Sequence, residues 1–314
     1  MTDDPLLGQQ LDEYRLEALL GQGGMASVYR ALDIHLHRYA AVKIIRTSFR
    51  ADSDYVIRFE REAQAIAKLE HPNIVRLYRY GEVQGLLYMA MHYIEGADLG
   101  SVLASYQADH EFIEPEEAAP IIRQVCLALD YAHGKGVIHR DVKPSNIMLD
   151  KQGNVFLTDF GLALSTEIGT RGEIFGSPHY IAPEQAIFSA NAIPQSDLYA
   201  VGVILYEMFT GQLPFEAENP LDVAMLHLTE PVRPPRELRP ELSQELEDVI
   251  LKTLAKEPED RYARGTDLAD ALEQILPTLP PATSPSLASR LTIPERISAE
   301  MAQHPLPPIS STLK

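Results

Sequence analysis

Strand-like and helix-like stretches are segregated along this chain. Before about residue 94, the stretches that suit strands are residues 14–20, 28–32, 39–45, 74–80 and 86–91. One helical pattern interrupts them, from about Asp54 to Glu70, and His71-Pro72 stops it. After Ala97, helical patterns dominate, at residues 115–134, 195–210, 220–228, 243–256 and 266–276. The order predicts a small sheet with one helix, followed by a mainly helical unit.

The bulk composition is that of a globular protein with about two compact units. The chain has 314 residues, and a soft prior is about 150 residues per domain. Its formal net charge of −18 repels phosphate backbones, so we expect no nucleic-acid partner. Cys126 is the single cysteine, which excludes a disulfide framework within the chain. Its apolar neighbours predict a buried core residue.

The two ends of the sequence bear on targeting and on a possible linker. The first residues lack the basic and apolar regions of a signal peptide, and no run approaches the ~18 apolar residues of a membrane span. We therefore expect a cytoplasmic location, with any membrane anchor outside this sequence. Residues 277–314 contain eight prolines and many Ser and Thr, which predicts a flexible tail or linker. Two pieces of it, Ser289–Thr292 and Pro294–Gln303, could be helical or could dock.

One short segment supplies most of a phosphoryl-transfer site. It reads H-R-D-V-K-P-S-N from His139 to Asn146, and Asp159-Phe160-Gly161 follows. Asp141 could receive a proton from an attacking hydroxyl, and Lys143 could touch the transferring phosphate. Asn146 and Asp159 offer the hard oxygen ligands that Mg²⁺ prefers.

Three other motifs occur in order with this segment. They are G-Q-G-G-M-A-S-V from Gly21 to Val28, A-V-K ending at Lys43, and A-P-E ending at Glu184. The set resembles the eukaryotic-like (Hanks-type) serine/threonine protein kinases of bacterial type, over roughly residues 14–276. The resemblance implies an α+β, two-lobed fold. It divides the chain into an extension (1–13), an N-lobe (14–94), a C-lobe (95–276) and the tail (277–314).

The resemblance also implies where ATP and magnesium would bind, with manganese as an alternative ion. The Gly-rich loop would cover the phosphates through Gly21, Gln22, Gly23 and Gly24, although Ala26 stands at the family's third glycine. Lys43 would hold the α- and β-phosphates. Its expected partner is a glutamate of the following helix. Glu62 fits the family pattern best, and Glu60 is the other candidate. Catalytic roles are thereby implied for Lys43, Glu62, Asp141 and Lys143.

The adenine pocket is also implied by resemblance alone. Met91 matches the gatekeeper position at its back, and the hinge follows it. The carbonyl of His92 and the amide of Ile94 would face adenine. The residues that would sandwich the base are Val28, Ala41 and Met148. For the methionines, ordinary core packing is compatible with this role.

The segment between Asp159 and Glu184 matches an activation loop. Arg140 precedes the catalytic aspartate, and in the family such an arginine often binds a phosphate on this loop. Thr166 and Thr170 are therefore candidates for autophosphorylation, because phosphate would gain charge-assisted hydrogen bonds there. Ser177 matches the Ser/Thr that contacts the catalytic Asp and Lys.

Several matches concern structure and not chemistry. His139, Phe160, Ile66 and Leu77 resemble the apolar stack of active kinases, and Asp197 would anchor that stack through the backbone of His139. Tyr199 stands where the family usually has Trp. Arg261 would pair with Glu184. The full set is His139, Phe160, Ile66, Leu77, Asp197, Tyr199, Arg261 and Glu184.

Lys143 indicates the acceptor, because in this family a lysine there accompanies Ser/Thr specificity. The expected partners are ATP and proteins with Ser or Thr, and a homodimer is compatible with the sequence. Two other readings are a pseudokinase scaffold, which would need a broken catalytic residue, and a small-molecule kinase, which would usually lack A-P-E and this lysine. The tail could be a linker or could fold back as a regulator.

Overall fold

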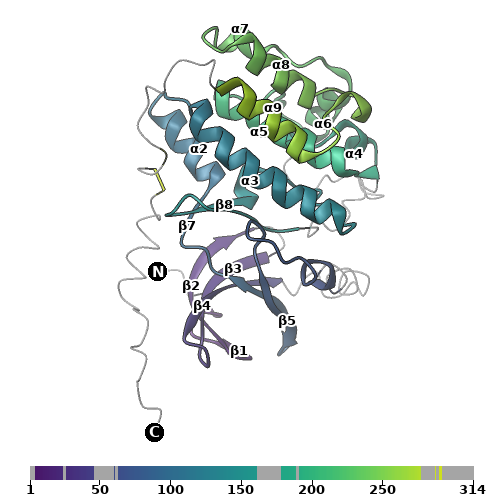
Figure 1. The fold of residues 1–314 in the computed structure, drawn as a ribbon. Helices are drawn as coiled ribbons and strands as arrows, with labels where there is room; N and C mark the ends of the chain where they lie inside the picture. The colour runs from purple at the N-terminus through teal and green to yellow at the C-terminus, as the bar shows by residue number, and fades with distance from the viewer. Residues whose placement is uncertain are drawn as a thin grey trace. The chain divides into compact units, whose positions relative to one another are not determined.

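The computed structural model describes residues 4–23, 26–45, 60, 63–160, 178–188, 191–276, 287 and 290–291. The chain forms two compact units. The small unit comprises Met1–Glu70, Val75–Glu95 and Thr292–Lys314. The large unit comprises His71–Ile74 and Gly96–Leu291. Figure 1 colours the strands of the small unit purple to blue and the helices of the large unit blue to yellow-green.

The small unit is built on a six-stranded antiparallel sheet with strand order β1-β2-β3-β4-β6-β5. Its strands are β1 (Gln10–Leu11), β2 (Tyr14–Gln22), β3 (Ala26–Asp33), β4 (Arg38–Ile45), β5 (Leu77–Val83) and β6 (Leu86–His92). The two-residue loop between β5 and β6 has positive φ at both Gln84 and Gly85. That is the backbone of the primed turns that suit two-residue hairpins.

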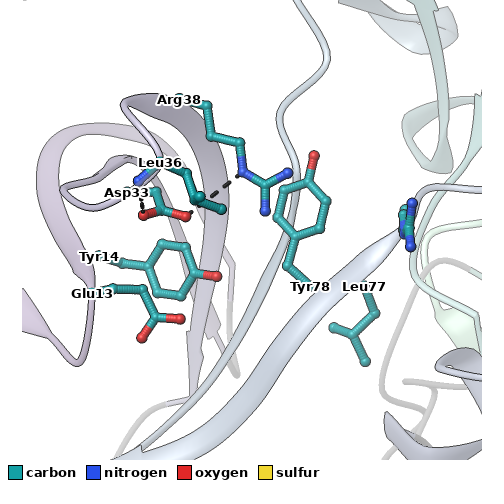
Figure 2. Close-up of a pocket in the computed structure, with 8 residues that line it drawn as sticks. Glu13, Tyr14, Asp33, Leu36, Arg38, Leu77 and Tyr78 are labelled. Atoms are coloured by element: carbon teal, nitrogen blue, oxygen red, sulfur yellow. Dashed lines mark hydrogen bonds and ion pairs between the residues drawn. The ribbon is translucent and has the colours of Figure 1, made fainter. Parts of the chain in front are cut away.

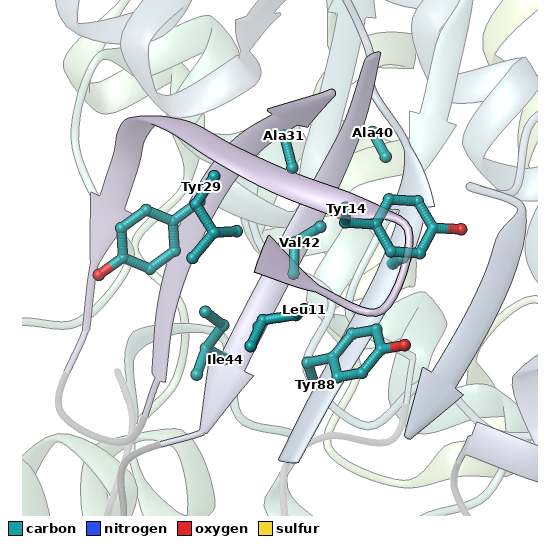
Figure 3. Close-up of a cluster of buried hydrophobic side chains, with 10 residues drawn as sticks. Leu11, Tyr14, Tyr29, Ala31, Ala40, Val42, Ile44 and Tyr88 are labelled. Atoms are coloured by element: carbon teal, nitrogen blue, oxygen red, sulfur yellow. The ribbon is translucent and has the colours of Figure 1, made fainter. Parts of the chain in front are cut away.

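Alternation along these strands puts the apolar core on one face of the sheet. Figure 3 shows this cluster, in which Tyr14 and Tyr88 meet edge to face with ring centroids 6.2 Å apart. The hydroxyl of Tyr88 donates to Asp12, which satisfies the polar end of an otherwise buried ring. The buried members are Leu11, Tyr14, Leu16, Tyr29, Ala31, Ala40, Val42, Ile44, Tyr88 and Ala90.

One expected strand begins later than its sequence suggests. Residues 74–80 were expected to be extended, but β5 begins at Leu77. Ile74 instead forms an isolated parallel bridge with Leu157 of the large unit. The cause is Asn73, whose side chain donates to the carbonyl of Val155 and whose own carbonyl accepts from Leu157. Of the helix expected over 54–70, residues 63–66 are helical, and most of the remainder lies outside the described residues.

The large unit joins a three-stranded antiparallel sheet to a set of helices. The strands are β7 (Gly96–Asp98), β8 (Ile147–Asp150) and β9 (Val155–Leu157). The longer helices are α2 (Leu99–Ala108), α3 (Pro115–Gly134), α5 (Pro194–Thr210), α6 (Pro220–Thr229), α8 (Gln244–Thr253) and α9 (Gly265–Ile275). The short ones are η2 (Pro144–Asn146), η3 (Pro178–Tyr180), α4 (Pro183–Ile187), α7 (Pro235–Leu238) and η5 (Pro258–Asp260).

Local sequence explains where many of these helices begin. Proline opens α3, α4, α5, α6 and α7, where its missing N–H costs nothing. Asp98 and Ser243 cap α2 and α8 by accepting backbone N–H groups. The longer helices expected from periodicity are confirmed within a few residues.

Helix α5 is the centre of the large unit, and it is buried along nearly its whole length. Helix α3 packs against α5 and α9, and Figure 1 shows α3 and α9 side by side. At Gly265 the two helices approach so closely that an added Cβ would lie 2.7 Å from the carbonyl oxygen of Cys126. Cys126 is fully buried, as expected, and burial raises the pKa of its thiol. Within the described ranges, no helix combines the length and apolar character needed to cross a bilayer.

Candidate active site

The segment from His139 to Asn146 is held by one buried carboxylate. Asp197 on α5 is 1% exposed and accepts the backbone N–H groups of His139 (2.9 Å) and Arg140 (2.8 Å). Its Oδ2 also lies 2.7 Å from Nε2 of His133 on α3. Arg140 has a φ of 69°, so the chain turns sharply just after the two amides that reach one carboxylate. The anchoring role expected for Asp197 is confirmed, whereas His133 was not recognised from the sequence.

Asp141, Lys143 and Asn146 form one hydrogen-bonded cluster. The Nζ of Lys143 donates to Oδ2 of Asp141 at 2.7 Å. The Nδ2 of Asn146 donates to the same oxygen at 3.0 Å and to the backbone carbonyl of Asp141 at 2.8 Å. The η2 turn makes this possible, because it folds Asn146 back so that its N–H donates to the carbonyl of Lys143. The structure therefore brings together three of the predicted site residues.

Asp159 is tied to this cluster through the backbone. Thr158 donates its N–H to the carbonyl of Asn146 at 2.9 Å, and its own carbonyl lies 2.9 Å from Nε2 of His139. Asp159 follows with a φ of 59°, a left-handed conformation that a non-glycine residue seldom adopts. Backbone strain of this kind is held only where the surrounding contacts impose it.

The large unit contains half of the expected apolar stack. The rings of His139 and Phe160 have centroids 4.5 Å apart, and Phe160 is 1% exposed. Ile66 and Leu77 belong to the small unit, where Ile66 is buried and Leu77 half-buried.

The expected pair between Glu184 and Arg261 is confirmed and is bidentate. Nη1 and Nη2 of Arg261 donate to the two carboxylate oxygens at 2.8 and 2.9 Å. Burial acts to raise the pKa of Glu184, but hydrogen bonds from Arg261 and Ser196 outweigh it and lower that pKa. Tyr199, at the family's Trp position, lies under Arg261 and hydrogen-bonds with Nδ1 of His227 at 2.9 Å. The side-chain pairing of Tyr199 with His227 has no signal in the sequence.

In the small unit, the predicted nucleotide residues share one face of the sheet. Val28 lies opposite Lys43, and Ala41 lies opposite Met91. Directly opposed residues share a face and successive residues alternate, so all four lie on the face opposite the apolar core. Gly21 of β2 is the cross-strand partner of Val28 of β3, so it lies beside these four residues. Their role in nucleotide binding stays a prediction.

The rest of the predicted nucleotide site is only partly described. Gln22 ends β2, and the N–H of Gly23 donates to the carbonyl of Ala26 at 2.9 Å. His92 ends β6, and Ile94 is 8% exposed. Met148 lies on β8 of the large unit, opposite Asp98. The other predicted positions fall outside the described residues; they are Gly24, Glu62, Thr166, Thr170 and Ser177.

Arg140 is the one predicted regulatory residue that the structure describes. It is exposed, and its backbone carbonyl accepts from Nε2 of Gln185 at 3.1 Å. Gln185 also caps its own helix by accepting from the N–H of Ala182. This glutamine therefore joins the start of α4 to the catalytic segment, a link that the sequence did not reveal.

The cation site implied by the resemblance fits the residues present. Because Nδ2 of Asn146 donates to Asp141, the amide oxygen is the end of that side chain suited to a metal. Asp159 adds a carboxylate on the adjoining backbone. In the described part of the chain there is no cluster of three or more His, Cys, Asp or Glu that could hold a metal. A two-ligand site is the kind that Mg²⁺ uses with water and substrate phosphates.

Figure 2 shows a pocket in the small unit that none of the predicted site residues lines. The guanidinium of Arg38 stacks 3.7 Å from the ring centroid of Tyr78, and its Nε lies 3.7 Å from Oδ2 of Asp33. Its lining mixes acidic and basic groups; the residues are Glu13, Tyr14, Asp33, Leu36, Arg38, Arg76, Leu77 and Tyr78. Neither Lys43 nor any of the other predicted nucleotide residues lines this pocket.

Comparison with known proteins gives one consistent family. A family model described as "Protein kinase domain" matches residues 14–275. Serine/threonine-protein kinase PrkC of Bacillus subtilis is 39% identical over 267 residues, which are 84% of this chain and 40% of that protein. Serine/threonine-protein kinase PknB of Mycobacterium leprae is 38% identical over 289 residues, 90% of this chain and 45% of that protein. The chain thus spans less than half the length of these two relatives.

Solved structures show the same likeness. The kinase domain of Mycobacterium tuberculosis PknI superposes with a TM-score of 0.69 at 30% identity, covering 85% of this chain and 98% of that one. Rad53 (residues 1–466), solved in complex with AMP-PNP, gives a TM-score of 0.66 at 28% identity, covering 82% of this chain and 64% of that one.

Proposed function

Because the chain belongs to the protein kinase domain family, we propose that it transfers the γ-phosphate of ATP to Ser or Thr hydroxyls of protein substrates. The observation that carries the proposal is the cluster in which Lys143 and Asn146 both donate to Oδ2 of Asp141. Phosphoryl transfer asks little covalent chemistry of the protein, so catalysis depends on positioning and charge. This cluster provides both the positioning group and the positive charge within one turn of chain.

Asp141 orients the substrate hydroxyl. Its Oδ2 is engaged by two donors, and we assign Oδ1 to accept the hydrogen of the attacking hydroxyl. A carboxylate is a weak base at neutral pH, so its main contribution is to aim the hydroxyl oxygen, with proton transfer late in the reaction. Asp197 holds the two amides before Asp141 in place, which limits how far the carboxylate can drift.

Lys143 supplies positive charge next to the hydroxyl. Its Nζ lies 2.7 Å from Asp141, and its side chain is 22% exposed. A cation there stabilises the charge that develops on the transferring phosphoryl group. The same lysine supports Ser or Thr as the acceptor, in agreement with relatives named serine/threonine-protein kinases.

ATP would bind the face of the small sheet that carries Val28, Ala41, Lys43 and Met91. Lys43 would hold the α- and β-phosphates, and Gly21 and Gly23 would let the backbone approach them closely. The complex of the similar Rad53 with AMP-PNP supports a nucleotide as ligand. Asn146 and Asp159 would hold Mg²⁺, which neutralises phosphate charge when it is bound.

A pseudokinase scaffold is the alternative from another class. It would bind nucleotide or partners without turnover, and it requires a broken catalytic residue. Lys43, Asp141, Asn146 and Asp159 are all present, as is Glu62 in the sequence. The intact set favours an active enzyme.

Incubation with labelled ATP, Mg²⁺ and a generic basic protein tests the proposal. We expect the wild type to phosphorylate itself and the protein on Ser and Thr, and Asp141→Asn to lower the rate about 100-fold or more, the scale of losing a positioned acid–base group. Asp267→Asn is the matched control, since it removes a carboxylate in an exposed pair with Arg264. If the wild type transfers no more phosphate than Asp141→Asn, the chain is not an active kinase.

Phosphosite mapping after the same incubation tests regulation. We propose Thr166 and Thr170 as autophosphorylation sites, with Arg140 as the group that binds the phosphate. Phosphate found elsewhere in the chain, with both threonines unmodified, would contradict this part alone.

A further inference from the structure

Three residues of the proline-rich tail are placed against the large unit. Leu291 is buried, with an exposure of 6%, and Arg290 is half-buried, with its side chain 9% exposed. Leu287 donates its N–H to Oε1 of Glu117 at 2.5 Å. A long charged side chain is seldom buried without partners, so the contacts of Arg290 decide whether this is a site.

Arg290 is bound by groups of α2 and of the loop that follows it. Nη1 donates to Oδ2 of Asp109 at 2.7 Å and to the carbonyl of Ser105 at 3.1 Å. Nη2 donates to Glu111. The guanidinium also lies over the ring of Tyr106, 4.1 Å from its centroid. Two carboxylates, one carbonyl and one aromatic face are the partners that a planar guanidinium fits and a lysine does not.

The surface that binds Arg290 is held in place by its own hydrogen bonds and is not a chance cluster of acidic residues. Tyr106 is 2% exposed, and its hydroxyl donates to Oε2 of Glu117 at 2.9 Å. The other oxygen of Glu117 accepts from Leu287, so one carboxylate orients the aromatic platform and binds the tail backbone. We call this surface the arginine cradle; its residues are Ser105, Tyr106, Asp109, Glu111 and Glu117.

The tail has a matching local fold. The N–H of Arg290 donates to the carbonyl of Leu287 at 2.9 Å, which makes a single turn of chain. That turn presents the arginine to the cradle while Leu291 is covered. The groups that the cradle offers thus match the guanidinium and the backbone N–H that the tail presents within the large unit.

We propose that the cradle is an internal binding site for an arginine-leucine segment and that its occupant is the chain's own tail, through Leu287, Arg290 and Leu291. The contacts of Arg290 hold this part of the tail against α2 and the loop that follows it. For these three residues, the proposal favours a tail that folds back over a free linker. The inference does not depend on the proposed catalytic activity.

Hydrogen–deuterium exchange of the full chain tests whether the tail binds the arginine cradle. Leu287 and Arg290 have hydrogen-bonded amides, so we expect peptides that cover residues 287–291 to exchange more slowly than peptides from the rest of the tail. In Arg290→Ala we expect that exchange to rise about tenfold, towards the rate of unstructured chain. A wild-type segment that already exchanges as unstructured chain would overturn the proposal.

Two further variants separate a specific site from a general charge effect. Arg296→Ala removes the other tail arginine and should leave exchange at 287–291 unchanged. Glu111→Gln should raise exchange in the same segment, and adding Arg290→Ala to it should bring no more than Arg290→Ala alone. Equal effects of the two arginine variants, or additive effects of Glu111→Gln and Arg290→Ala, would refute a specific cradle.

Discussion

Replacing Glu184 by glutamine should strongly destabilise the large unit. The side chain of Arg261 is fully buried, and that of Glu184 is 15% exposed. Arg261 also donates to the carbonyls of Ala255, Gln195 and Lys256. With glutamine at position 184, the guanidinium of Arg261 stays buried, because its other hydrogen bonds hold it there, but it has lost its counter-charge.

The expected cost follows from that geometry. Breaking a buried ion pair by removing one partner typically costs about 3–5 kcal/mol, because the remaining charge is desolvated and uncompensated. An exposed pair offers a matched control. Asp267 pairs with Arg264, which is 69% exposed, and Asp267→Asn should cause no measurable change.

Urea unfolding followed by far-UV circular dichroism measures the loss. The pKa of Glu184 is lower in the folded chain, so its contribution is complete above its usual value of 4.5 and is lost as pH falls through the folded pKa. The gap between wild type and Glu184→Gln should accordingly be full at pH 7 and shrink in acid. A loss below about 1 kcal/mol at pH 7, the range of exposed pairs, would refute the reasoning.

Two other substitutions test the packing of the large unit. His227 is fully buried, and burial lowers its pKa to about 3, so the free energy of unfolding should fall as pH drops from about 6.5 to about 3. His227→Gln should flatten that part of the stability–pH curve, and an unchanged slope would contradict this reasoning. Gly265→Ala should cost about 1–3 kcal/mol in urea unfolding, since its Cβ would meet the backbone of Cys126 on α3. Gly134→Ala, where nothing lies within 4 Å, is the control, and equal losses would refute the clash.

The catalytic segment was accessible to sequence reasoning because its parts are close in the chain. Asp141, Lys143 and Asn146 lie within six residues, and one short turn brings their side chains together. Asp197 lies 58 residues after His139, and only the family resemblance suggested their contact. His133 and Gln185 were missed, because no local pattern distinguishes a histidine or glutamine that bonds a distant segment from one that faces solvent.

The longer helices of the large unit after residue 114 and most strands of the small sheet follow from the sequence. Prolines at helix starts and alternating burial along strands are properties of near neighbours, since backbone hydrogen bonds in helices and tight hairpins join residues close in the chain. The sheet face that carries Lys43 and Met91 likewise follows from alternation once the strands are paired.

Long-range pairings were decided by the tertiary structure. Asp130 of α3 caps the start of α9 by accepting from Gly265 and Thr266, Asn73 bonds β9, and Arg290 bonds Asp109 across 181 residues. The chain has 45 acidic and 27 basic residues, so charge alone allows many pairings. Only the tertiary packing brings the correct partners from distant parts of the chain together in the right orientation, and that information is not local in the sequence.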